Sequence, residues 1–541
     1  MRRVSWSSRC FFACLLAVVL SGASVPVPRA AVVTRAEAAS VPDSALDAVN
    51  SFLRERMAEM RLPGAAVVVV QDGELVHSAA FGRADDSGRP MTADTPVLLA
   101  STTKSLTAIA VLQQVEAGHL RLDEPVRTYL PWFSLQDSRS SQITVRHLLN
   151  QSSGMASKDT AFEGSFAQDP EALEEGVRAL SGSPLAGTPG EAFGYANANF
   201  NILGLLVQTV SGQPFGDYMR QHVFGPLGMN HSHPTRAAAR ADGAAYGYSR
   251  WFGSFWQQTE VPAPTTGMPS STMYASAHDL SQELLMLLDE GSFDGRRLLQ
   301  PDSVRAMLTP AVRIDESKMY AMGWFTRPLV ESVPANFGGS ETGLPLLAEH
   351  QGEWGNSHTY LAMVPSSRLG VALVINANDT SSPSRLKSID TNILRILHGQ
   401  EPVPAVVHED WLQRYSWAVA LALLLAELLS LWLALRMLFP RQADKPRAIR
   451  LWSVGLGALA LDALALWLCF SYAPTKFDTG LAVIIRQFPD VGVMLAPVLG
   501  LALLWSLPRT FWLLVPNRSR FSTGAGSKNV SQMSAGPPSR H

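Results

Sequence analysis

Ser101 and Lys104 are the first residues whose types and spacing suggest covalent chemistry. They lie three positions apart, just ahead of an apolar series with helical spacing that ends at Gly118. Residues three apart share one face of a helix, so the amine would face the hydroxyl. A serine hydroxyl hardly ionises at neutral pH and needs a neighbouring base to become a nucleophile. The pattern therefore predicts a nucleophilic Ser101 at a helix start, where backbone N–H groups face a developing negative charge.

A second Ser-x-x-Lys match runs from Ser384 to Lys387. It lies in the polar stretch 379–388, and no apolar helical series follows it. We interpret this second match as a solvated surface turn. Ser101 is the predicted nucleophile, but the short motif needs partners elsewhere in the chain.

Tyr195 and Asn197 form the second candidate feature. No other tyrosine in the chain is followed by any residue and then asparagine, and an apolar helical series continues at 202–206. A phenol has an unperturbed pKa near 10, but beside a lysine cation it could pass protons to and from a serine oxygen. Asn197 offers a donor and an acceptor to a substrate amide. The alternative interpretation is a tyrosine packed at a helix start that is capped by asparagines.

The third feature is His350-Gln351-Gly352-Glu353, just ahead of a predicted strand at 359–364. A glycine in a strand allows its backbone to approach a ligand closely. The backbone N–H groups of Glu353 and Ser101 could then form an oxyanion hole. Taken alone, a histidine such as His350 would more often be a surface residue than a site residue.

These three motifs, in this order, resemble the serine β-lactamase and penicillin-binding-protein family. The surrounding segments resemble its class C-like branch, and the resemblance covers residues 43 to 397; it includes residues 116–118, 122–126, 148–154, 187–190 and 226–229. The resemblance implies an acyl-enzyme mechanism in which Ser101 attacks a carbonyl and Lys104 and Tyr195 share the proton transfers. It also implies that Asn197 holds the substrate amide, and that no metal or other cofactor is needed.

The segment 350–353 departs from the family pattern. The resemblance implies that His350 replaces the lysine of the usual Lys-Thr-Gly and contributes to substrate binding with Gln351 and Gly352. Thr, Ser or Gly is commoner than glutamine at the position of Gln351. We expect the acidic Glu353 to repel a substrate carboxylate, which argues against true β-lactamase activity.

The predicted fold is an α/β class C β-lactamase-like fold. A helix at 43–60, capped by Asp43 or Ser44, precedes a hairpin with strands at 65–71 and 74–81. We expect this hairpin to share one antiparallel sheet with late strands at 323–325, 359–364 and 370–376. The helices predicted between 169 and 229 would form a separate lobe.

Composition limits the class of protein. The chain has 541 residues and a formal net charge of -2, which gives no electrostatic footprint for nucleic acid. Its three cysteines, Cys10, Cys14 and Cys469, all lie in apolar segments at the two ends. Disulfides and thiolate metal sites are therefore not expected in the long middle of the chain.

The two ends predict a membrane protein. Residues 1–39 have the pattern of an export signal, with a retained N-terminal anchor as the alternative. We expect an extracytoplasmic domain at 40–403, a transmembrane domain at 404–515 and a cytoplasmic tail at 516–541. The predicted spans are 416–439, 451–472 and 491–507, and the distribution of Lys and Arg places the first loop and the tail inside. Two acidic residues fall within these spans, Glu427 and Asp462; we favour structural polar contacts over substrate passage or signalling for them.

The sequence thus predicts a membrane-anchored serine hydrolase that acts on an amide or ester, such as a peptide bearing a D-residue. Its layout is similar to that of prodrug-activating peptidases of nonribosomal peptide pathways. The alternatives are a slowly deacylating penicillin-binding sensor, an esterase or a β-lactamase. The expected partners are a small peptide or acyl substrate and the lipid bilayer, and the oligomeric state stays open.

Overall fold

The computed structural model describes residues 40–155, 171–438 and 448–477, with scattered residues between 481 and 504. The predicted export signal, the predicted tail and parts of the predicted span 491–507 lie outside these described residues.

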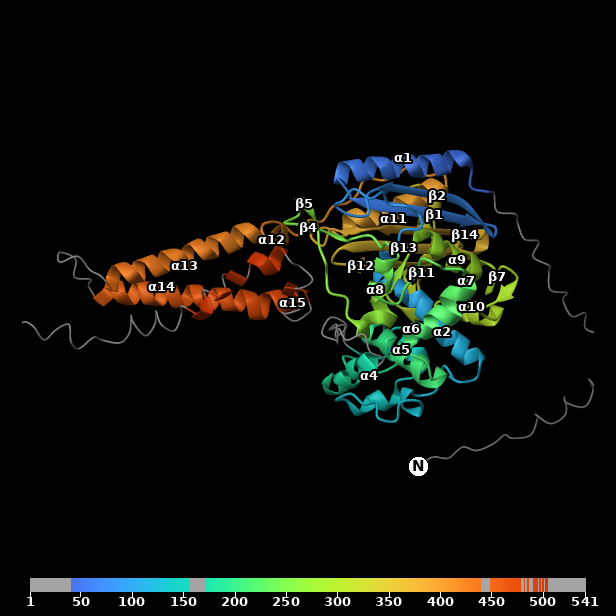
Figure 1. The fold of residues 1–541 in the computed structure, drawn as a ribbon, viewed down its shortest axis with the longest axis horizontal. Coiled ribbons are helices and arrows are strands. Elements are labelled where there is room, and N and C mark those ends of the chain that lie inside the picture. The colour runs from blue at the N-terminus through green and yellow to red at the C-terminus, as the bar shows by residue number, and fades with distance from the viewer. Residues whose placement is uncertain are drawn as a thin grey trace, which may run out of the picture. The chain divides into compact units, whose positions relative to one another are not determined.

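An eight-stranded antiparallel sheet is the frame on which the rest of the domain is built (Figure 1). Its strand order is β2-β1-β14-β13-β12-β11-β10-β9, so the first hairpin pairs with strands from near the end of the domain. The strands are β1 (Gly64–Gln71), β2 (Glu74–Gly82), β9 (Val312–Arg313), β10 (Met319–Tyr320), β11 (Phe325–Pro328), β12 (Leu346–Trp354), β13 (Ser357–Val364) and β14 (Leu369–Ile375).

Smaller sheets and many helices surround this frame. Two of the smaller sheets have two strands each: β3 (Val97–Leu98) pairs with β6 (Tyr274–Ala275), and β7 (Ser292–Phe293) pairs with β8 (Arg296–Arg297). In a three-stranded sheet, β4 (Tyr248–Trp251) lies between β5 (Phe255–Gln258) and β15 (Ala377–Asn378). The α-helices of the domain are α1 (Asp43–Met60), α2 (Thr103–Glu116), α3 (Val145–Leu149), α4 (Glu171–Arg178), α5 (Asn197–Ser211), α6 (Phe215–Tyr218), α7 (Gly225–Leu227), α8 (Arg236–Ala241), α9 (Ala277–Leu288), α10 (Pro301–Leu308) and α11 (Ser384–Leu397).

The hairpin of β1 and β2 turns at Asp72 and Gly73, as predicted. Both residues have positive φ, 51° and 88°, and this is the backbone that a tight two-residue hairpin requires. Helix α1 is also confirmed, but its predicted cap was wrong. The helix is preceded by Pro42, and Asp43 lies in the first turn, where its charge favours the helix N-terminus.

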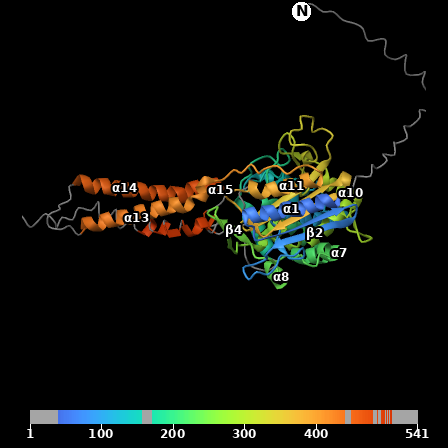
Figure 2. The ribbon, with the colours of Figure 1, turned by 90° about the horizontal axis from the view of Figure 1, so that it is seen from above.

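Both faces of the central strands are buried, and this explains the unbroken apolar run in β1. Val67 and Val69 pack in the cluster beneath α1 and α11, which lie side by side over the sheet (Figure 2). Val68 and Val70 point the other way, into the larger cluster that includes α2, α5 and α9. Because successive residues of a strand face opposite sides, the valines of β1 pack against apolar residues on both faces of the sheet.

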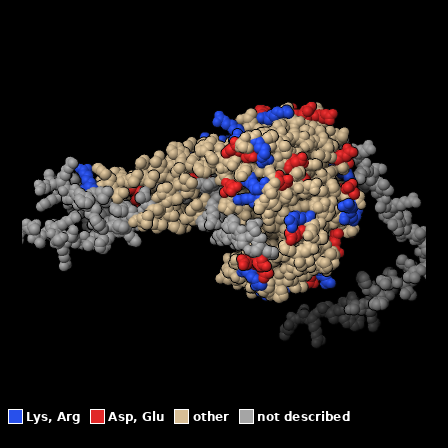
Figure 3. All heavy atoms as spheres, viewed as in Figure 1, with Lys and Arg blue, Asp and Glu red and all other residues tan. Residues whose placement is uncertain are grey.

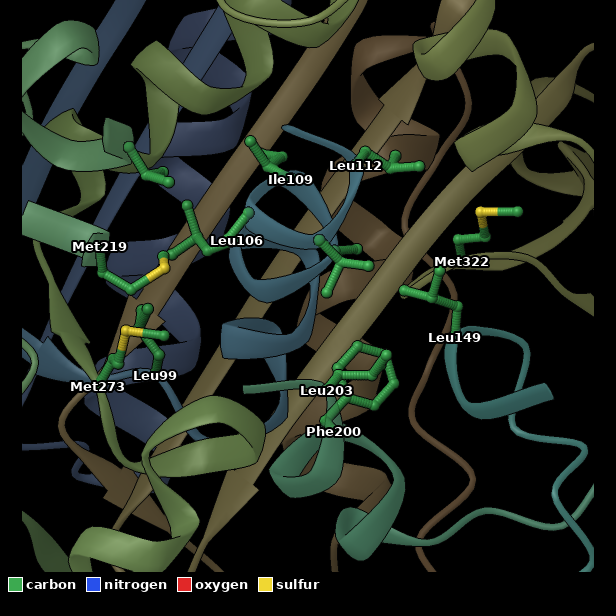
Figure 4. Packing of buried hydrophobic residues seen from close by; sticks show 14 of the residues in the cluster. Leu99, Leu106, Ile109, Leu112, Leu149, Phe200, Leu203, Met219, Met273 and Met322 are labelled. Carbon is green, nitrogen blue, oxygen red and sulfur yellow. The ribbon is translucent and has the colours of Figure 1, made fainter. Parts of the chain in front are cut away.

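Helix α2 runs through the larger core, between the sheet and the helical lobe. Its Leu106, Ile109 and Leu112 are almost completely buried and share one hydrophobic cluster with Phe200 and Leu203 of α5 (Figure 4). The predicted helical lobe is therefore attached directly to the helix that carries Lys104. This packing holds the beginning of α2 in a rigid environment.

Two long apolar helices follow the domain, after the short α12 (Trp411–Arg414). Helix α13 (Ser416–Leu438) packs against α14 (Ala448–Trp467) through Ala420, Leu423 and Ala465, and α15 (Ala473–Phe477) follows. Among the described residues, one helix is long and apolar enough to cross a membrane, over Ser416–Leu433 with mean hydropathy 1.9. The bundle of three transmembrane helices stays a prediction.

Glu283 of α9 is an acidic residue inside the larger core. Its side chain is fully buried and lies near the Ser105 hydroxyl of α2. Burial raises the pKa of the Glu283 carboxyl to about 8, because the charged form is poorly solvated there. The folded protein therefore holds a proton that the unfolded chain releases near pH 4.5.

We expect Glu283→Gln to flatten the pH dependence of stability. A raised carboxyl pKa contributes stability fully below pH 4.5, and that contribution is lost as the pH rises towards 8. The wild type should lose about 3 kcal/mol of unfolding free energy between pH 4.5 and 7 that the variant retains. Urea unfolding at several pH values measures this, with the exposed Glu290→Gln as control. Parallel pH profiles for the wild type and Glu283→Gln would contradict the assignment.

Candidate active site

Ser101 lies in a single 3-10 turn, η1 (Ala100–Thr102), immediately before α2. The preceding residue, Ala100, has a left-handed φ of 50°, a conformation that costs a non-glycine residue about 1 kcal/mol. The Leu99 carbonyl is held by two hydroxyls, Thr102 Oγ1 at 2.8 Å and Thr359 Oγ1 at 2.6 Å. These bonds join the turn to the central sheet and maintain the strained backbone beside Ser101.

The Lys104 side chain is completely buried, and its ammonium has a full set of acceptors. Lys104 Nζ donates to Ser101 Oγ at 3.1 Å, to Asn197 Oδ1 at 2.6 Å and to the Ser270 carbonyl at 2.9 Å. Ser270 lies in η8 (Met268–Thr272), so three separate segments converge on this amine. An ammonium has three N–H donors, and each one has an acceptor here.

Tyr195 also contacts the predicted nucleophile, Ser101. Its hydroxyl donates to Ser101 Oγ at 2.8 Å, and Lys104 Nζ lies 4.8 Å from the centre of its ring. The structure thus brings together the predicted serine, lysine and tyrosine, which are separated by up to 94 positions in the chain. Asn197 lies at the first position of α5, where its side chain contacts Lys104.

Gln151 holds the loop that carries Tyr195, and sequence reasoning did not identify it. Its backbone φ is 54°, and its carbonyl accepts from the Gly194 N–H at 2.8 Å. Its side-chain oxygen accepts from the Ala196 N–H at 3.0 Å and from the Asn199 side chain. The segment 148–154 was included in the family resemblance, but no spacing rule connects position 151 with 194–199.

Strand β12 carries the predicted segment from His350 to Glu353. The pairing of β12 with its neighbour β11 stops at the pair of Glu349 and Phe325. Beyond Glu349, no strand among the described residues pairs with that edge of β12. Gly352 allows this edge to approach η1, because an added Cβ would overlap the Leu99 carbonyl oxygen and the Thr359 hydroxyl. The oxyanion hole formed by the N–H groups of Ser101 and Glu353 stays a prediction.

His350 is buried and faces the nucleophile side of the sheet. Its Nδ1 lies 2.8 Å from the Gln351 carbonyl and its Nε2 lies 3.3 Å from the Tyr320 hydroxyl. A carbonyl only accepts, so Nδ1 carries the proton and Nε2 accepts from Tyr320. Burial, and then the positive charge of Lys104, lower the pKa of His350 to about 3. The imidazole is therefore neutral at physiological pH.

Gln351 and Glu353 face the opposite side of β12, and this corrects two expectations. Gln351 Nε2 donates to Asp390 Oδ2 at 2.9 Å, and the Glu353 carboxylate lies 3.2 Å from Lys387 Nζ. The Gln351 side chain is therefore directed towards α11 and not towards a substrate at Ser101. The Glu353 carboxylate, balanced by Lys387, does not face a substrate either. Alternate strand residues point to opposite faces, and that rule accounts for both placements.

The polar stretch that contains Ser384 and Lys387 was also misjudged. It forms the beginning of α11, an amphipathic helix whose inner face is buried against the sheet, and not a solvated turn. Its Asp390 is fully buried and binds His358 Nε2 at 3.0 Å as well as Gln351. Burial opposes a charge on His358, but the adjacent Asp390 carboxylate outweighs it and raises the pKa of the imidazole.

No group of three or more His, Cys, Asp or Glu side chains that could hold a metal ion occurs among the described residues. The chemistry available at this site is that of a hydroxyl between an amine and a phenol. Such an arrangement suits the transfer of an acyl group to Ser101 Oγ, because both neighbours can exchange protons with the nucleophile.

The antiparallel sheet, with Ser101 and Lys104 beside Tyr195 at the start of α2, is consistent with the class of serine hydrolases. The Beta-lactamase family model matches residues 49–391. The chain therefore belongs to the β-lactamase and penicillin-binding-protein-like family of serine hydrolases.

The chain is similar to several known members. It is 25% identical over 355 residues to protein flp of Staphylococcus aureus. This alignment covers 64% of this chain and 66% of that protein. Over 199 residues it is 38% identical to esterase EstB of Burkholderia gladioli, covering 34% of this chain and 49% of the esterase. The octameric penicillin-binding protein homologue from Pyrococcus abyssi superposes with a TM-score of 0.55 at 26% identity, covering 66% of this chain and 78% of that one. The match spans slightly less than two thirds of the length of the flp proteins.

We predict that Gly352→Ala slows acylation of Ser101 by about 10²-fold, the scale of losing one oxyanion donor. The added methyl group must push β12 away from the Leu99 carbonyl. Stopped-flow measurement of the reaction with an activated aryl ester, followed by release of its phenol, tests this. Gly182→Ala is the matched control, because a Cβ there meets no atom within 4 Å. An unchanged rate in Gly352→Ala would show that this close approach does not matter for acylation.

Asp390→Ala should lower the unfolding free energy by about 3–5 kcal/mol, because it leaves the buried His358 without its charge partner. Asp302→Ala on the surface of α10 should change it by less than about 0.5 kcal/mol. Chemical denaturation of both variants measures the difference. A loss at Asp390 no larger than that at Asp302 would exclude a stabilising buried network.

Proposed function

We propose that this protein is a membrane-anchored serine hydrolase that acts on an amide or ester through an acyl-enzyme on Ser101. One observation carries the proposal: Ser101 Oγ lies 3.1 Å from Lys104 Nζ and 2.8 Å from the Tyr195 hydroxyl. A surface serine has no need of a fully buried lysine, whereas a nucleophile requires a group that takes its proton.

In the proposed reaction, Ser101 Oγ attacks the substrate carbonyl carbon. Its proton passes to Lys104 Nζ or to the Tyr195 oxygen, whichever is in its basic form. The negative charge on the carbonyl oxygen is stabilised by the N–H groups of Ser101 and Glu353. The carbonyl re-forms as the bond to the leaving alcohol or amine breaks, and the same pair returns the proton to the leaving atom. Water then hydrolyses the acyl-enzyme by the reverse proton path.

The proposed role of Asn197 differs from a purely substrate-binding one. Its Oδ1 accepts a 2.6 Å hydrogen bond from Lys104, so it orients the amine. The substrate contact that the family resemblance implies and the position of the proton acceptor would therefore both depend on this one side chain.

The proposed substrates are small peptides, including those that bear a D-residue, and other acyl amides or esters. Neutral His350 stands where the family commonly has a cationic lysine, which disfavours substrates recognised by a carboxylate, such as penicillins. Removal of a prodrug cap from a nonribosomal peptide is compatible with this chemistry. The esterase relative from Burkholderia gladioli favours ester hydrolysis as the second candidate activity.

The proposed anchor is the C-terminal apolar region, with the catalytic domain on the outer face of the cytoplasmic membrane. Helix α13 exposes large apolar side chains, which water does not favour; they include Leu425, Leu429 and Trp432, each more than half exposed. Figure 3 shows charged side chains distributed over the domain and few on the surface of this helical region. A lipid environment would satisfy this surface.

We predict that Ser101→Ala reduces labelling by a fluorescent fluorophosphonate at least about 10²-fold, and that Ser384→Ala leaves it unchanged. Lys104→Ala and Tyr195→Phe should each slow labelling by about 10²- to 10⁴-fold, because general-base assistance is lost. Gel fluorescence on the purified full-length protein gives the rates. Equal labelling of wild type and Ser101→Ala would refute the proposed nucleophile.

The lifetime of the adduct separates the enzyme from the alternative, a slowly deacylating sensor. Loss of an acyl group from Ser101 within seconds, with repeated turnover of an activated ester, supports hydrolysis. An acyl group that persists for hours would favour the sensor.

A further inference from the structure

Five aromatic rings form a continuous wall beside the nucleophile: Phe193, Tyr195, Tyr320, Phe325 and His350. The Phe325 ring lies 5.0 Å from His350, 4.8 Å from Tyr320 and 6.4 Å from Tyr195 between ring centres. Phe193 extends the wall, with its ring 5.5 Å from Tyr320 and 6.3 Å from Phe325. We refer to these five residues as the aromatic wall.

The wall has a buried layer and an accessible layer. Tyr320 and His350 are buried, and their polar atoms are used within the wall by the bond between Tyr320 and His350 Nε2 and by the bond from His350 to Gln351. Phe193 and Phe325 are only partly buried. The accessible part therefore offers ring carbon to a ligand, and His350 has no N–H donor left to offer a carboxylate.

The position of Tyr195 shows which part of a substrate meets the wall. Its hydroxyl bonds to Ser101 Oγ, so it can return a proton to the atom that leaves the substrate carbonyl. The ring of Phe325 lies nearly parallel to that of Tyr195, at 9°. A group attached to the departing oxygen or nitrogen would extend past Tyr195 towards Phe325.

Lys318 lies against the wall and belongs to a charge cluster with Arg327, Glu331 and Glu349. Lys318 Nζ lies 4.4 Å from the centre of the Phe325 ring, and 4.0 Å from the Glu349 carboxylate. The Lys318 ammonium lies over the Phe325 ring, and the Glu349 carboxylate is held more closely by Arg327, at 2.8 Å. An anionic substrate group here would compete with Glu349 for Lys318.

We propose that the aromatic wall is a leaving-group subsite that selects substrates whose departing alcohol or amine is uncharged and apolar, preferably aromatic. This inference rests on the proposed acyl-enzyme function and adds a substrate class to it. Apolar contact with the rings favours such a group by about fourfold per buried methylene. Aromatic leaving groups gain further from ring–ring packing.

Two aryl acetates of similar leaving-group basicity test the proposal. 4-Methylphenyl acetate releases an apolar phenol, and 4-(carboxymethyl)phenyl acetate releases an anionic one. Phenol release from the full-length protein gives the second-order acylation rate for each ester. We expect the wild type to react with 4-methylphenyl acetate at least about tenfold faster than with 4-(carboxymethyl)phenyl acetate.

Matched variants assign this preference to the wall. Phe325→Ala and Phe193→Ala should each reduce the preference severalfold, while Phe325→Leu, which keeps an apolar side chain, should retain most of it. Phe255→Ala removes a phenylalanine that is 50% exposed on β5, outside the aromatic wall, and should leave both rates unchanged. Thermal unfolding of each variant shows that it is folded.

Equal acylation rates for the two esters in the wild type would contradict the proposed leaving-group subsite. So would a Phe325→Ala variant that keeps the full wild-type preference for 4-methylphenyl acetate. A preference for the anionic ester that disappears in Lys318→Met would overturn it too, and would assign recognition to the Lys318 charge. Failure of the proposed function is distinguishable, because then neither ester would acylate Ser101 in the wild type.

Discussion

The buried ammonium of Lys104 is the constraint on which the active site depends. A fully buried ammonium is very unfavourable unless its N–H donors have acceptors, and Lys104 Nζ has three oxygen acceptors from η1, α5 and η8. Only one of these acceptors, Ser101 Oγ, is the proposed nucleophile. The other two, Asn197 and the Ser270 carbonyl, orient the amine and reduce the cost of burying it. Correct convergence of these segments is thus a condition for stability and for chemistry.

The surrounding structure serves this convergence from two directions. On one side, α2 is held in a close-packed core against α5, and Gln151 holds the loop that carries Tyr195. On the other side, β12 contributes alternate residues to two tasks. His350 and Gly352 face the nucleophile, while Gln351 and Glu353 bind Asp390 and Lys387 of α11. One strand therefore joins the reaction centre to a buried polar network.

Short-range patterns predicted much of this arrangement. The spacing of Ser101 and Lys104 follows from helix geometry, and the hairpin at Asp72-Gly73 follows from turn chemistry. The order of the three motifs then indicated the family, and with it the sheet that joins β1 to β14. These features depend on residues that are close in sequence or on a recognisable order along the chain.

The missed features depend on partners that are distant in the chain. The directions of Gln351 and Glu353 follow from the register of β12, which a four-residue motif does not determine. The polar face of α11 looked like a solvated turn because the partners of its Asp390, His358 and Gln351, lie 32 and 39 positions earlier. Gln151 was overlooked because its hydrogen bonds reach a loop more than 40 residues away.

The most direct measurement of the central claim is peptide mapping by mass spectrometry after brief reaction of the full-length protein with an acylating ester. The account predicts one acyl group, located on the peptide that contains Ser101, with a yield that collapses when Lys104 is replaced by alanine. An acyl group located on another residue, or equal acylation of Ser101 without Lys104, would contradict it.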